Sequence, residues 1–121
     1  MVWKFHNDAP IYAQLVEQIK IAIVTGEFAA GERLPSVRDM AAEAGVNPNT
    51  LQRAFAELER EGLVYSQRTA GRLVTEDANI IRDAKRQLAQ RHVLAFLGAM
   101  EALGFEKNEI IDLLRQEKGD I

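Results

Sequence analysis

One short stretch of the chain carries the hydrogen-bonding groups that base edges and phosphates require. On a helix, Asn49, Gln52 and Arg53 would share an exposed face, with the hydroxyl of Thr50 nearby. No acidic residue follows until Glu57. Amides can bond adenine bidentately, a guanidinium can do so with guanine, and a hydroxyl can bond a phosphate. These residue types at this spacing indicate contact with double-stranded DNA.

A sharp turn between two helical patterns would present this face to a partner. Ser36 stands where it can cap a helix, with Asp39 three residues later, as in a capping box. Gly45 can adopt the left-handed conformation that ends a helix, and Asn47 can cap the next helix with Pro48 in its first position. This spacing predicts a helix-turn-helix. The residues expected to face inward are Val37, Met40, Ala41 and Ala44 on the first helix and Leu51, Ala54, Phe55 and Leu58 on the second.

The period changes from helical to extended after the second of these helices. The stretch "LVYSQRTAGRLVT" has β-branched and apolar residues on both sides of a turn at Thr69–Gly71, which predicts a hairpin. Arg68 and Arg72 flank its tip and could lie along a phosphate ridge or enter a minor groove. A hairpin after a helix-turn-helix is a winged helix.

Further helical patterns flank the winged helix. One opens at Pro10, repeats apolar residues every four positions and ends at Gly26. From Asp77 onward a long and then a short helix carry an apolar stripe that is too small to close on itself, so we expect a second copy of the chain to cover it. The stripe includes Ile81, Leu88, Phe96, Leu103, Ile110 and Leu114. We therefore expect a mostly α fold with a small β-hairpin wing: a winged-helix domain at 1–76 and a helical dimerisation region at 77–121.

Composition excludes several classes of function. The 121 residues contain no cysteine, which removes disulfides and thiolate metal sites. His6 and His92 have no close set of carboxylates, so neither a metal nor a cofactor is expected. The chain shows no apolar run long enough to cross a membrane, and its start lacks the basic and then apolar order of a signal peptide. These features predict a cytoplasmic protein. Its net charge of −3 decides little, because attraction to phosphate is local and screened over ~10 Å.

The segments "GERLPSVRDMAAEAGVNPNTLQRAFAELEREGLV" and "AGRLV" resemble the winged-helix domain of GntR-type bacterial transcription regulators. The short helical tail resembles the YtrA-type branch, so the resemblance covers essentially the whole chain. It implies a homodimer that binds a palindromic operator, usually as a repressor and often of its own operon with an ABC transporter. By position it implies DNA contacts at Arg38, Asn47, Asn49, Thr50 and Arg53 and a wing-tip glycine at Gly71. Where the family wing carries two glycines around one residue, Thr69 and Ala70 here precede a single glycine.

Each of these assignments has a structural alternative. Arg38 and Arg53 could be solvated arginines, Asn49 and Thr50 could serve helix capping alone, and Gly71 could be only a turn residue. Trp3 and Phe5 alternate as in a short strand and are expected to cover a core edge or the dimer seam. The alternative function is a winged-helix protein-interaction module. An enzyme is disfavoured, because no nucleophile with a base and no phosphate-binding glycine loop is evident.

Overall fold

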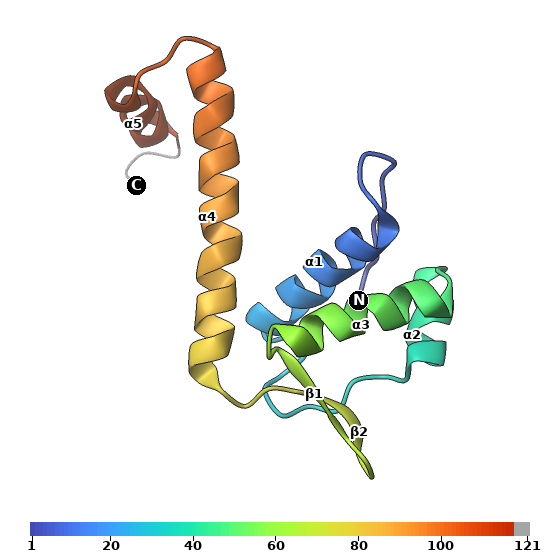
Figure 1. Ribbon diagram of the computed structural model, residues 1–121. Helices are drawn as coiled ribbons and strands as arrows, with labels where there is room; N and C mark the ends of the chain where they lie inside the picture. The colour runs from blue at the N-terminus through green and yellow to red at the C-terminus, as the bar shows by residue number, and fades with distance from the viewer. Residues whose placement is uncertain (118–121) are drawn as a thin grey trace. The chain divides into compact units, whose positions relative to one another are not determined.

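The computed structural model describes residues 1–117, which form two compact units: one spans Met1–Lys85 and the other begins at Arg86. The elements are α1 (Ile11–Val24), α2 (Val37–Ala44), α3 (Pro48–Arg60), β1 (Val64–Gln67), β2 (Gly71–Val74), α4 (Ala78–Ala102) and α5 (Lys107–Gln116). In the first unit, α1 packs along α3 and the hairpin projects from the end of α3 (Figure 1). This mostly helical arrangement with a small β wing confirms the predicted fold class.

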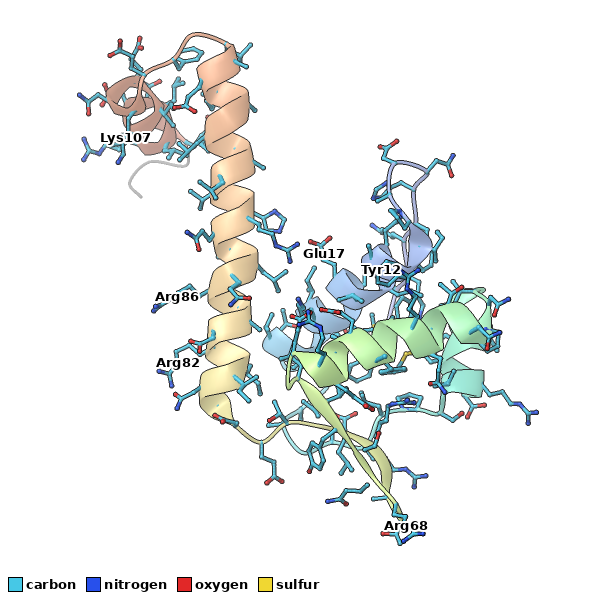
Figure 2. The ribbon with its side chains drawn as sticks, viewed as in Figure 1. Tyr12, Glu17, Arg68, Arg82, Arg86 and Lys107 are labelled. Atoms are coloured by element: carbon cyan, nitrogen blue, oxygen red, sulfur yellow. The ribbon has the colours of Figure 1, made fainter. Side chains whose placement is uncertain are left out.

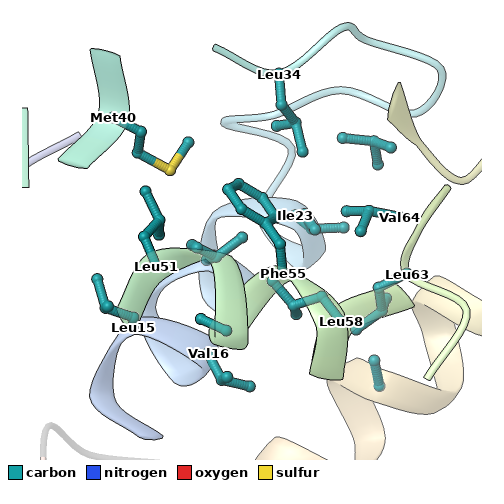
Figure 3. Close-up of a cluster of buried hydrophobic side chains, with 14 of the residues drawn as sticks. Leu15, Val16, Ile23, Leu34, Met40, Leu51, Phe55, Leu58, Leu63 and Val64 are labelled. Carbon is teal, nitrogen blue, oxygen red and sulfur yellow. The ribbon is translucent and has the colours of Figure 1, made fainter. Parts of the chain in front are cut away.

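Phe55 lies at the centre of the core of the first unit (Figure 3). It is fully buried, as are Leu15 and Ile19 on α1 and Leu51 and Leu58 on its own helix. The predicted inward residues of α3 are therefore correct. Removing a buried aromatic ring of this kind typically costs about 3–5 kcal/mol, so this cluster holds α3 firmly in place.

The start of α2 and the turn between α2 and α3 have the predicted caps, although among the described residues only the Ser36 half of the capping box forms. The Ser36 hydroxyl accepts a hydrogen bond from the Asp39 amide (3.1 Å), and the Asn47 side chain accepts one from the Asn49 amide (2.8 Å). Gly45 is left-handed, with φ 71° and ψ 35°. Local interactions thus set where both helices begin and where α2 ends.

The wing forms the predicted hairpin, with its turn at a different position. β1 and β2 are antiparallel, but the turn comprises residues 68–70 and Gly71 already belongs to β2, so the predicted turn was one residue late. Backbone hydrogen bonds also tie the segment at 31–34 to β2. They run from Gly31 N to Val74 O (3.0 Å), Val74 N to Glu32 O (2.9 Å) and Leu34 N to Arg72 O (2.9 Å).

The chain before α1 runs beside that helix without forming a strand. Gln18 binds both backbone groups of Lys4, with its amide nitrogen donating to the carbonyl (2.6 Å) and its oxygen accepting from the N–H (3.1 Å). Trp3 and Phe5 stack 6.2 Å apart and pack against the core. This position confirms the core-edge alternative for the two aromatics.

The long helix α4 begins in the first unit. Ile80, Ile81 and Ala84 pack against the core of that unit, which explains why the unit extends to Lys85, beyond the expected boundary at residue 76. α5 begins with a capping box in which Glu106 and Glu109 satisfy each other's backbone amides. Across residues 1–117, none of the helices is long and apolar enough to cross a membrane.

Candidate nucleic-acid interface

The N-terminal half of α3 presents a polar face to solvent. Asn49, Gln52 and Arg53 are exposed, and Thr50 is half-buried. Because the opposite face of the helix is buried in the core, these side chains cannot rotate inward without unfolding the domain. The structure therefore groups the four predicted residues of α3 on one accessible surface.

Two further predicted contacts, Arg38 and Asn47, precede this surface in sequence. Arg38 is the second residue of α2 and is exposed. Asn47 is exposed too, but its side-chain oxygen is engaged by the Asn49 amide as the cap of α3. Asn47 therefore has a structural role whether or not it contacts a ligand.

Arg53 has a partner that the sequence did not indicate. Its guanidinium carbon lies 3.8 Å from the centre of the Tyr12 ring on α1. Arg53 is therefore not simply a solvated arginine, because a cation over an aromatic face at this distance is attracted by the ring quadrupole. Helical spacing alone could not reveal the contact, since the two residues are far apart in sequence.

The two arginines of the wing occupy different environments. Arg68 is exposed at the tip of the hairpin, where Figure 2 shows it pointing away from the helices. Arg72 is half-buried, and its Nε donates to Glu59 Oε1 on α3 at 2.9 Å. Between them, Gly71 has φ +80°, a conformation that side chains other than glycine rarely adopt.

A groove of about 350 Å³ lies between the wing and the segment before α2. Arg33 and Ser36 line one side, and Gln67 and Arg72 line the other. Arg33 was not among the predicted contacts. Its position one residue before the buried Leu34, in a segment paired with β2, is a tertiary feature that periodicity could not indicate.

The acidic residues at the C-terminal end of α3 are each paired with a base. Glu57 binds Arg60, Glu59 binds Arg72, and Glu61 Oε1 lies 2.7 Å from Lys20 Nζ. The hydrogen bond from Arg60 lowers the pKa of Glu57 to about 2. Pairing offsets the negative charge near the interface, which explains how a chain with net charge −3 can offer a surface suited to a polyanion.

The predicted dimerisation residues divide into two groups. Leu88 and Ile110 are buried and Ile81 packs against the core of the first unit, so these three are already covered. Phe96, Leu103 and Leu114 are exposed, Leu103 at 72%. The exposed apolar residues of α4 and α5 also include Val93, Leu94 and Leu113.

Comparison with known proteins agrees with this geometry. Residues 11–74 match the family described as "Bacterial regulatory proteins, gntR family". The HTH-type transcriptional repressor YtrA of Bacillus subtilis (strain 168) is 28% identical over 116 residues, which cover 95% of this chain and 89% of that protein.

Solved structures show the same fold. A GntR family transcriptional regulator from Listeria monocytogenes has a TM-score of 0.86 and 38% identity, covering 94% of this chain and 100% of its own. The DNA-binding domain of AraR, solved in complex with operator ORX1, has a TM-score of 0.57 and 26% identity, covering 62% of this chain and 96% of its own. The chain therefore belongs to the GntR family of bacterial regulatory proteins, in its YtrA-type branch, and is a non-enzymatic DNA-binding transcriptional regulator.

Proposed function

We propose that the protein is a homodimeric repressor that binds an inverted-repeat operator in the cytoplasm. The observation that carries this proposal is the polar, acid-free half of α3, exposed while its other face is locked in the core. Asn49, Gln52 and Arg53 would contact base edges in a major groove. Arg38, Thr50 and Arg68 would contact phosphates on either side.

A second copy of the chain would cover the exposed apolar residues of α4, of α5 and of the turn between them. Leu103 and Leu94 are 72% and 60% exposed, and apolar surface left open in this way commonly marks an interface. A two-fold pair would bring two α3 helices to half-sites about 34 Å apart, or a multiple of that distance. The operator would accordingly be an inverted repeat.

Repression is supported by the relative YtrA, which is named as a transcriptional repressor. The resemblance to the YtrA-type branch further suggests control of the protein's own operon, including an ABC transporter. No effector molecule forms part of the proposal.

Gel-shift titration with duplexes from upstream of the protein's own gene tests the proposal. A selective complex should form with one inverted repeat and not with a shuffled duplex of equal length. Gln52→Ala on α3 should weaken that complex, whereas the control Gln87→Ala, at an exposed position on α4, should not. Failure to find any selective complex would favour the alternative of a protein-interaction module.

A further inference from the structure

Glu59 on α3 binds both strands of the wing at one position. Its Oε1 accepts hydrogen bonds from the Ser66 hydroxyl (2.6 Å) and from Arg72 Nε (2.9 Å). Ser66 on β1 and Arg72 on β2 are register partners across the hairpin. A single carboxylate on α3 therefore holds the two strands at the same point of the ladder.

Arg72 is also fixed from its other side. Its guanidinium carbon lies 4.9 Å from the centre of the Phe55 ring, which is fully buried and four residues before Glu59 on α3. The side chain of Arg72 is only 25% exposed. Stacking on a fixed ring and bonding to a carboxylate together hold this arginine inside the domain rather than at the wing surface.

We propose that Glu59 and Arg72 are positioning residues that set the direction of the wing relative to α3. Arg72 then makes no phosphate contact of its own, and Arg68 at the wing tip is the arginine that meets the backbone of DNA. This inference rests on the proposed function, in which α3 and the wing bind one operator together. A wing held at a constant angle reaches the DNA without the entropic cost of ordering it on binding.

The rival assignment makes the opposite prediction for Glu59. If Arg72 were a phosphate contact, the neighbouring carboxylate would repel DNA and compete for the guanidinium. Glu59→Gln would then tighten binding. If the pair positions the wing, the same substitution weakens binding, because a neutral amide holds the guanidinium less strongly.

Fluorescence anisotropy with the operator duplex over a series of salt concentrations separates these assignments. We expect Glu59→Gln and Arg72→Gln each to weaken binding by roughly 5- to 50-fold, and the double variant to lose no more than the worse single one. Neither substitution should change the slope of log affinity against log salt concentration. The control Arg68→Gln should flatten that slope by about one unit per protomer. Tighter binding by Glu59→Gln, or a slope flattened equally by Arg72→Gln, would overturn the proposal.

A measurement without DNA separates failure of this inference from failure of the proposed function. In amide hydrogen exchange of the free protein, Glu59→Gln should speed exchange in the wing, at Gln67 and Leu73, and leave the core of α3 protected. Unchanged wing exchange would refute the positioning role even if the protein bound its operator well. If wing exchange is faster but the protein forms no selective DNA complex, the positioning role of Glu59 stands and the proposed function is refuted.

Discussion

The guanidinium of Arg53 on α3 stacks over the ring of Tyr12 on α1, 3.8 Å from its centre. Tyr12 is half-buried and packs against the core, so its position is set by the fold and not by the arginine. An exposed side chain on the predicted DNA-contacting face is thereby held in one place before any DNA arrives. Such preorganisation lowers the entropic cost of binding.

Tyr12→Leu is expected to impair the same base contact as loss of Arg53. An exposed cation–π contact contributes about 0.5–1 kcal/mol, so its loss should cost a few-fold in affinity. Arg53→Ala should cost about 1–3 kcal/mol and relax preference at one base pair. Competition assays with operators substituted at each position measure this, with Tyr12→Phe as the control that keeps the ring. Equal weakening on every sequence after Tyr12→Leu would contradict the assignment.

Gly45→Ala should lower stability by about 1–2 kcal/mol, because the left-handed φ of +71° crowds a Cβ against its own backbone. No other atom lies within 4 Å of that Cβ, so the cost is conformational alone. Gly98→Ala in α4 is the matched control, since that site is equally open but helical, and it should stabilise by about 0.5–1 kcal/mol. Denaturant unfolding measures both, and equal shifts in the two variants would refute the conformational explanation.

The contribution of Glu59 to stability should depend on pH. Its hydrogen bonds from Ser66 and Arg72 lower its pKa below the ordinary value of 4.5, against burial, which raises it. The unfolded chain therefore takes up the proton more readily than the folded one, and the contribution is present above about pH 4.5 and lost as the pH falls through the lowered pKa. Unfolding of wild type and Glu59→Gln should differ by a constant amount from pH 6 to pH 8 and converge in acid. If the stability difference between wild type and Glu59→Gln grew as the pH fell, the lowered pKa of Glu59 would be contradicted.

Leu103→Glu should yield a monomer that remains folded, because this side chain is 72% exposed and a charge there is costly only against a second chain. Operator affinity should fall toward that for a half-site. In a dimer, binding of one domain holds the second domain close to its half-site, and a monomer lacks this gain in effective concentration. Light scattering measures the mass, and Gln90→Glu, at an exposed polar position on α4, is the control. A wild-type protein that is already monomeric at micromolar concentration would refute the dimer.

Much of the candidate site followed from the sequence alone because its determinants are local. The caps at Ser36 and Asn47 join groups two or three residues apart, and Gly45 has the conformation its place between two helices requires. Helical period likewise determined which side of α3 is buried, because four residues on one face must meet the core together.

Only the tertiary structure decided what the arginines do. Arg53 meets Tyr12, and Arg72 meets Glu59, through the packing of α3 against α1 and the wing. The pairing of the segment at 31–34 with β2 and the burial of Leu88 and Ile110 likewise were not evident from period or composition. These contacts join residues far apart in the chain, so their partners depend on how elements pack, which no local pattern encodes.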